Sequence, residues 1–226
     1  MPRIAASIVF TASSSPLRNA VVVTGDDGTV LSVSRGNPSF EEMAGVQYYS
    51  GILVPGFADV MCGEAPDPGW LLSRGVRVAG AESLPAGLSG RQVISGKPGE
   101  PVRVDWQNRY GGQVGFLVYG SRENFNLLFG EGHGEGLLLW GGQDLPVLAG
   151  YGGRDLLQVM YSLQESGCCK LPELLTMASL NGALATGYGD TAGSIEPGKK
   201  SGLNIIEGAD LHNMKLLPES RLRRLV

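Results

Sequence analysis

Short apolar segments separated by turn residues dominate the first quarter of the chain. They are strand-sized and rich in Val and Ile, which favour extended backbone, and they comprise residues 4–10, 20–24, 30–33 and 47–54. Asp26-Asp27-Gly28 is a turn signal typical of hairpins, and Pro55-Gly56 ends the last segment. The pattern predicts a hairpin-rich β unit at the N-terminus.

Glycine and proline interrupt residues 57–150 at short intervals, so no long element is expected there. The apolar runs between the interruptions are strand-sized and lie at 76–78, 102–104, 114–119 and 137–140. Only residues 122–129 favour a helical turn or two.

Helical spacing of apolar residues begins after residue 155. Residues 156–163 predict a helix with Gly167 as its C-cap, and a second helix is expected from Pro172 to about Thr186, before Gly187. Ile195 and the segment 203–206, which reads Leu-Asn-Ile-Ile, then indicate a return to β structure. An Arg-rich segment follows.

Composition excludes several classes of function. The 226 residues carry a net charge of -4 and no basic stripe, which argues against nucleic-acid binding. No apolar run approaches the roughly 18 residues of a membrane helix. The 35 glycines are about twice the usual share of roughly 7% and predict many tight turns. The two histidines, His133 and His212, exclude any site that needs three histidine ligands.

Three cysteines, Cys62, Cys168 and Cys169, do not form a disulfide framework, because their number is odd and two of them are adjacent. They indicate a reduced compartment, and we expect a cytoplasmic protein. The first ten residues could also be a very short signal segment, but they are better interpreted as a first strand.

Two segments resemble the amidohydrolase superfamily, in particular its deaminase and chlorohydrolase-like branch. Residues 51–59 read Gly-Ile-Leu-Val-Pro-Gly-Phe-Ala-Asp, like the family's passage from a β-sandwich into the first barrel strand. Residues 174–183 and then 193–200, which include Glu196-Pro197-Gly198, are similar to the last barrel helix and the return to the sandwich.

The resemblance implies an α/β fold with a composite β-sandwich, built from residues 1–56 and 190–226, around a (β/α) barrel in residues 57–189. That insert is shorter than the roughly 200 residues that an eightfold barrel needs, so we expect a shortened, incomplete barrel. Family members hold one or two divalent metal ions at the carboxyl ends of the barrel strands. Such a metal lowers the pKa of a bound water, and the resulting hydroxide attacks a carbonyl or amidine carbon.

The metal ligands of the family do not carry over. The two histidines expected after the Pro-Gly-Phe passage correspond to Met61 and Gly63, with Cys62 between them. A thioether is a poor ligand for Zn²⁺ or Fe²⁺, and glycine has no side chain. The essential aspartate near the end of the barrel corresponds to Gly152. We therefore assign no catalytic, cofactor-binding or metal-binding residue and expect no cofactor, with Zn or Fe as the alternative if the protein is active.

The loop at residues 130–136 has two interpretations. Its imidazole and two carboxylates, on His133, Glu131 and Glu135, could bind a metal or, with the glycines, a phosphate. A flexible polar hairpin is the simpler interpretation, because the loop lacks the ending of a P-loop.

The remaining polar candidates favour ordinary structural roles. Carboxylates that could act as acids or bases are expected to be solvated, and they are Glu64, Asp67, Asp144 and Asp155. Cys62 could be a reactive thiol, although no histidine lies near it in sequence and a buried cysteine is commoner. The basic end of the chain, with Lys215, Arg221, Arg223 and Arg224, is expected to be a solvated face.

Three functions remain. We favour a non-catalytic amidohydrolase relative that works as a binding or assembly partner, as a homo-oligomer or with a paralogue. The alternatives are a metal-dependent hydrolase or deaminase with a remodelled site around His133, and a small-molecule binder without chemistry. Neither nucleic acid nor a membrane is expected as a partner.

Overall fold

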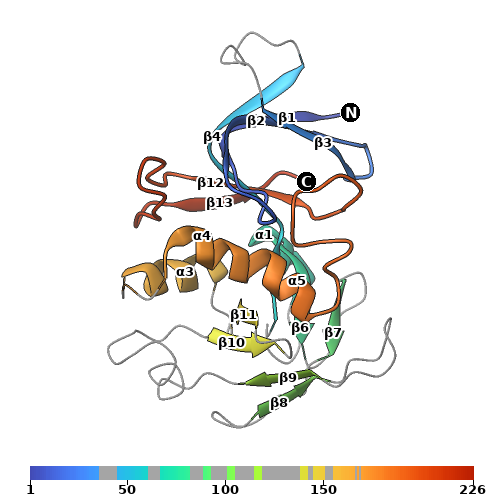
Figure 1. Cartoon of the computed structure of the whole chain (residues 1–226), viewed down its shortest axis with the longest axis vertical. Coiled ribbons are helices and arrows are strands. Elements are labelled where there is room, and N and C mark those ends of the chain that lie inside the picture. The colour runs from blue at the N-terminus through green and yellow to red at the C-terminus, as the bar shows by residue number, and fades with distance from the viewer. Residues whose placement is uncertain are drawn as a thin grey trace.

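A computed structural model describes residues 1–35, 45–60, 67–81, 89–92, 101–104, 115–118, 138–141, 145–150, 155–165, 167 and 169–226. The fold is mixed α/β. A large sheet lies at one end of the molecule, a layer of helices lies beneath it, and shorter strands lie at the other end (Figure 1). Within these residues no helix is long and apolar enough to cross a membrane.

The large sheet joins both ends of the chain. Its six strands, in spatial order, are β13 (Arg221–Arg224), β12 (Leu203–Glu207), β4 (Val46–Pro55), β1 (Arg3–Val9), β2 (Leu17–Thr24) and β3 (Val30–Arg35). Only the β1–β4 pair is parallel. The predicted N-terminal hairpins are confirmed, and Gly28 has the positive φ of 80° that its turn requires.

The main core lies between this sheet and the helices. Fully or nearly fully buried side chains from both layers interlock there, namely Ile8, Phe10, Ile52, Val54 and Ile206 from the sheet and Leu156, Met160, Leu163, Leu171 and Leu174 from the helices. The other face of the sheet packs against Ile195 of the segment that precedes β12 and against Val226. Alternating apolar residues therefore bury both faces of the central strands.

Both predicted helices are confirmed, with one irregularity. They are α3 (Leu156–Glu165) and a continuous run made of α4 (Leu171–Thr176), the π-helical turn η2 (Met177–Asn181) and α5 (Gly182–Ala185). The hydroxyl of Ser179 donates to the carbonyl of Leu175 within this run. The π turn was not predictable, because apolar spacing does not register one inserted residue.

A short helix, α1 (Pro68–Ser73), lies where the sequence indicated only an interruption. Asp67 is its N-cap and accepts a hydrogen bond from the backbone N–H of Trp70 at 2.7 Å. Proline at the first helical position lacks an N–H that would be unpaired there in any case. The Pro-Asp-Pro-Gly segment is therefore a helix start as well as a turn.

The shorter strands form two sheets of different kinds. One is parallel, with the order β5 (Phe57–Asp59), β6 (Val76–Ala81) and β7 (Ser89–Gln92). The other is antiparallel, with the order β11 (Leu145–Leu148), β10 (Leu138–Gly141), β9 (Gly115–Val118) and β8 (Pro101–Val104). The four predicted apolar runs are thus strands, whereas the possible helical turn at 122–129 lies outside the described residues.

The antiparallel sheet departs from the expected (β/α) barrel pattern. Only residues 142–144 connect β10 to β11, whereas a parallel crossover needs a dozen or more residues. A connection of that length can only form a hairpin. In the part of the structure described here, parallel pairing of the barrel kind is confined to β5, β6 and β7 among the shorter strands.

Candidate functional site

The Pro-Gly-Phe passage directs the chain out of the large sheet at Gly56. The backbone N–H of Gly56 donates to the carbonyl of Ser201 at 3.1 Å, and a Cβ at Gly56 would lie 2.4 Å from that same oxygen. Phe57 then begins β5, fully buried, and its N–H donates to the carbonyl of Gly75 at 2.8 Å. Glycine is required at residue 56 because any side chain would separate the two backbone segments.

The carboxyl ends of β5 and β11 meet. Asp59, the last residue of β5, is only 2% exposed, and its Oδ1 accepts a hydrogen bond from the backbone N–H of Gly150 at 3.0 Å. Gly150 follows β11 by two residues. The contact therefore brings together two points of the chain, at residues 59 and 150, that lie far apart in sequence.

The helix of the second family-like segment contacts the same two strands. The side-chain Nδ2 of Asn181 donates to the carbonyl of Pro146 in β11 at 2.8 Å. Gly182 lies so close to β5 that a Cβ there would be 2.6 Å from the carbonyl oxygen of Ala58. Residues 181 and 182 of this helix thus contact both β5 and β11.

The loop before β12 is held by a partly buried polar network. The Nζ of Lys199 donates to the Ser194 hydroxyl at 2.7 Å and lies 3.0 Å from the Glu196 carboxylate. The Ser194 hydroxyl is also hydrogen-bonded to Glu196, and these contacts, the hydroxyl first and the ammonium second, hold the pKa of Glu196 below its usual value. The Ile195 N–H donates to the carbonyl of Thr11, just after β1, and backbone bonds between Val30 of β3 and residues 198 and 199 attach the loop to the large sheet. The segment is therefore scaffold.

The residues at the two strand ends do not fit a divalent metal. The described residues at these ends are Asp59, Val60, Ala149 and Gly150. Asp59 alone among these four has a carboxylate, and that carboxylate accepts a hydrogen bond from a backbone N–H. A zinc site needs at least three protein ligands. Across the residues that the structure describes, no group of three or more His, Cys, Asp or Glu side chains could hold a metal ion.

The positions that correspond to the family's metal ligands lie outside the described residues. They are Met61, Gly63 and Gly152, and the same holds for Cys62, Cys168 and the loop with Glu131, His133 and Glu135. Cys169 is partly buried against the main core. For these positions the structure therefore shows only where nearby residues such as Asp59 and Gly150 lie.

Two of the four candidate carboxylates are helix caps. Asp67 caps α1, as described above. Asp155 is buried at the start of α3, where its Oδ1 accepts from the N–H of Leu157 at 2.9 Å and its Oδ2 accepts from Arg74 at 2.5 Å. These bonds give both aspartates a structural role. Glu64 and Asp144 lie outside the described residues.

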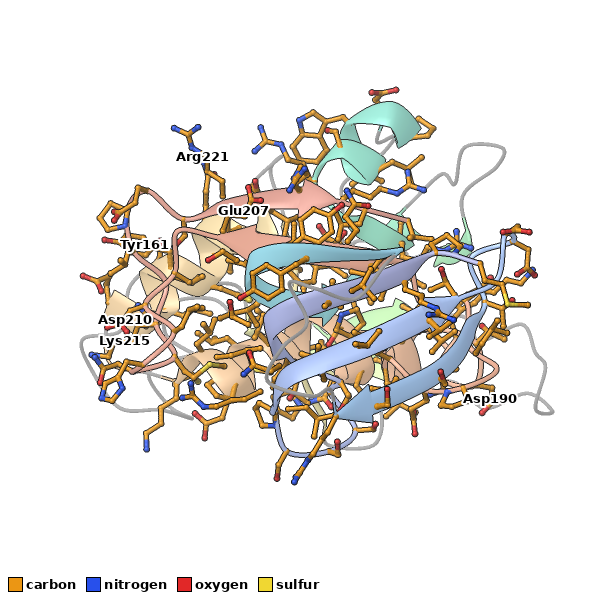
Figure 2. All side chains as sticks on the ribbon, turned by 90° about the horizontal axis from the view of Figure 1, so that it is seen from above. Tyr161, Asp190, Glu207, Asp210, Lys215 and Arg221 are labelled. Carbon is orange, nitrogen blue, oxygen red and sulfur yellow. The ribbon has the colours of Figure 1, made fainter. Side chains whose placement is uncertain are left out.

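The basic end of the chain is a strand rather than a loose polar segment. Arg223 of β13 donates to the Glu207 carboxylate at 2.6 Å and lies over the Tyr49 ring at 4.9 Å. Figure 2 shows Glu207 and Arg221 together on β12 and β13, where they are paired in register. An Arg-rich strand was not predicted, because charges at an exposed sheet edge hide the alternating pattern.

Lys215 and His212 belong to a separate turn. Residues 210 and 215 form an isolated bridge, and Figure 2 shows Asp210 and Lys215 together at the periphery. The Asp210 carboxylate accepts from the backbone N–H of Asn213 at 3.0 Å and of His212 at 2.9 Å, and bonds to Asn213 are the main reason that its pKa is lowered. This turn is exposed and lies apart from the ends of β5 and β11.

Asp59 is the residue that sequence analysis missed. It was quoted as part of a family-like passage, but nothing in its spacing indicated a partner 91 residues away. The available signal was a carboxylate at the end of an otherwise apolar strand, which must find a hydrogen-bond donor if it is buried.

Comparison with known proteins supports one family. The model of the amidohydrolase family matches residues 142–222, which include α3, the helix run 171–185, the polar loop and β12. A search of curated proteins found no match.

Solved structures show only distant likeness. A prolidase-like protein from Bifidobacterium longum has a TM-score of 0.47 and 14% identity, over 94% of this chain and 90% of that one. An adenosine deaminase from Xanthomonas campestris with bound zinc has a TM-score of 0.47 and 13% identity, over 95% and 86%. An ochratoxinase from A. niger has a TM-score of 0.26 and 17% identity, over 35% and 25%.

The family assignment consequently rests on the family model and on the two sequence segments described above. The second of those segments falls inside the matched region, and the first leads into β5, whose end contacts the end of β11. Over residues 142–222, about a third of the chain, this protein is similar to the amidohydrolase family.

Proposed function

We propose that this protein is an amidohydrolase relative of the deaminase and chlorohydrolase-like branch that has lost its metal-binding positions and serves as a non-catalytic binding or assembly partner. The observation that carries the proposal is the set of residues at the three corresponding ligand positions, Met61, Gly63 and Gly152. None of them offers the nitrogen or carboxylate oxygen donors that Zn²⁺ or Fe²⁺ prefers.

The contacts of Asp59 support this proposal. Among the described residues, the Asp59 carboxylate is the possible metal ligand nearest in sequence to Met61. It accepts a hydrogen bond from the backbone N–H of Gly150. A carboxylate that satisfies a buried backbone amide is already used in holding the fold. The family's chemistry, attack by a metal-bound water, therefore lacks a protein site at these strand ends.

We further propose that the large sheet corresponds to the family's composite sandwich and that β5, β6 and β7 are what remains of a parallel barrel. Strands from both ends of the chain share that sheet, and the passage at Gly56 connects it directly to β5. The antiparallel β8–β11 sheet would then replace the rest of the barrel.

An assembly role is supported by the outermost strands of the large sheet, β13 and β3. Backbone hydrogen bonds to residues 198 and 199 cover β3 at Val30, so β13 is the edge that we propose for association with a second chain. We therefore propose a homo-oligomer or a complex with a paralogue, in the cytoplasm.

The second candidate is a metal-dependent hydrolase of C–N bonds with a remodelled site. Similarity to a hydrolase family favours it, and His133 with Glu131 and Glu135 would be the replacement ligands. A small-molecule binder without chemistry would differ from both in binding purines, pterins or nucleosides with a rise in melting temperature.

Metal content and light scattering on the same purified sample test the proposal. We expect far less than one zinc or iron per chain after expression in metal-supplemented medium, together with a mass above that of one chain. One tightly bound zinc or iron per chain would contradict the loss of the site. A strictly monomeric protein at high concentration would contradict the assembly role.

A triple variant tests whether the three ligands alone have been lost or whether the rest of the metal site is missing as well. Met61→His, Gly63→His and Gly152→Asp together supply three groups of the family's pattern. We expect this triple variant to remain without efficient deaminase activity, because further barrel histidines are missing and ligands need supporting groups to orient them. Efficient, chelator-sensitive turnover by the variant would show that only those ligands had been lost.

A further inference from the structure

The ends of β5 and β11 are joined through a side chain rather than through a β ladder. β5 pairs with β6, β11 pairs with β10, and the two strands belong to different sheets within the described residues. The hydrogen bond from the Gly150 N–H to Asp59 Oδ1, at 3.0 Å, links them directly.

We propose that Asp59 is a positioning residue that tethers the end of β11 to the end of β5. The tether fixes the position of Gly150, just after β11, relative to the last residue of β5. In a barrel enzyme the loops after the strand ends carry the active site. Asp59 would therefore set the geometry of this face of the molecule, whatever the face binds.

Burial explains why a carboxylate is effective here. Asp59 is 2% exposed, and a buried carboxylate is costly unless hydrogen-bond donors surround it. Hydrogen bonds to an ionised acceptor are shorter and about twice as strong as neutral ones. The backbone amide of Gly150, in turn, lies in a buried stretch of chain and needs an acceptor.

The helix run 171–185 also holds β5 and β11, so the Asp59 bond is needed only at the ends of these strands. Its Asn181 donates to the carbonyl of Pro146, and its Gly182 contacts Ala58, so β5 and β11 are each held on the helix before their ends. Loss of the Asp59 bond should consequently release the strand ends while the strands themselves stay in place.

Amide hydrogen exchange at Gly150, resolved by NMR, tests the tether in the full chain. Replacing Asp59 by alanine should speed exchange of the Gly150 amide by about tenfold, the equivalent of one lost hydrogen bond. Asp59→Asn keeps an acceptor but a neutral one, so a smaller increase is expected.

Asp155→Ala is the matched control. Asp155 is the other buried aspartate that accepts a backbone N–H near β11, and it bonds to Leu157. We expect this variant to speed exchange at Leu157 and not at Gly150, and Asp59→Ala to do the reverse. Equal acceleration of Gly150 exchange by both variants, or none by Asp59→Ala, would overturn the tether.

Two further measurements keep the proposal decidable. If Asp59→Ala does not fold, unchanged Gly150 exchange in Asp59→Asn overturns the proposal and selective acceleration supports it. Zinc is added to the wild-type protein in a parallel arm, and we expect no effect on Gly150 exchange. A stoichiometric zinc-dependent change would make Asp59 a ligand and overturn the tether. Metal content alone tests the lost site, so the two proposals fail separately.

Discussion

Gly182 offers a direct test of how closely the helix run 171–185 approaches β5. In an ordinary helix interior, replacing glycine by alanine stabilises the protein by about 1 kcal/mol, because alanine restricts the unfolded chain and favours the helix. At Gly182 a Cβ would lie 2.6 Å from the carbonyl oxygen and 2.8 Å from the Cβ of Ala58. Both atoms belong to a buried strand and cannot rotate away.

We therefore expect the usual sign to reverse. Forcing a methyl group into a packed interior costs about 1–3 kcal/mol, which exceeds the gain in helix propensity. Gly182→Ala should lower the free energy of unfolding by up to about 2 kcal/mol, the difference between the two contributions. A movement of the helix away from β5 would also weaken the Asn181 bond to Pro146 in β11.

Urea unfolding followed by circular dichroism measures the change, with Gly69→Ala as the control. Gly69 lies in α1, where a Cβ would be 3.4 Å from the nearest atom, a side-chain oxygen of Asp67. The control should be neutral or slightly more stable than the wild type. An equal or higher urea midpoint for Gly182→Ala would refute the close contact between helix and strand.

Three more predictions concern buried polar contacts, each checked by urea unfolding. Asn181→Ala removes the bond to β11 and should cost about 0.5–1.5 kcal/mol, the usual net contribution of one hydrogen bond. Asp155→Ala should lower the free energy of unfolding by about 1 kcal/mol through the lost helix cap, and Asp155→Asn should lower it less. Arg74→Ala should lower it by under about 1 kcal/mol, because the ion pair between Arg74 and Asp155 is partly exposed. Glu196 has a lowered pKa when folded, so its bonds with Lys199 stabilise the protein fully above the ordinary value near 4.5 and lose this effect as the pH falls below it. The midpoints of wild type and Glu196→Gln should therefore differ most at neutral pH and converge as the pH falls below about 4.5; a constant difference would argue against this linkage.

The sequence predicted most of the regular elements because their signals are local. Alternating apolar residues and the Asp-Asp-Gly turn predicted the N-terminal hairpins, and helical spacing predicted α3 and the helix run 171–185. The Pro-Gly-Phe passage also predicted a change of sheet at Gly56, where the structure places the transition from β4 to β5.

Elements that depend on distant contacts were not predictable. β13 is charged, and its strand conformation depends on pairing with β12. The antiparallel arrangement of β8–β11 contradicts a (β/α) repeat that was expected from family resemblance rather than from the residues themselves. Propensity alone cannot choose between such pairings, because strand preference is set largely by neighbours.

The candidate site shows the same division. The residues that correspond to the family's ligand positions, Met61, Gly63 and Gly152, could be named by position in a family-like pattern. The bond between Asp59 and Gly150 joins residues 91 positions apart and has no local signal. A sequence therefore indicates which chemistry is missing more readily than which contact holds the remaining structure together.

Ammonia release by the purified wild-type protein tests the central claim most directly. The protein is incubated with excess Zn²⁺ or Fe²⁺ and a panel of amino-purines and amino-pterins, with a chelator-treated sample and a protein-free blank beside it. If the metal-binding positions are lost as proposed, release is indistinguishable from the blank in every sample, because Met61, Gly63 and Gly152 supply no ligand for a metal-bound water. Turnover that co-purifies with the protein and disappears with chelator would contradict the account and would direct attention to His133, Glu131 and Glu135.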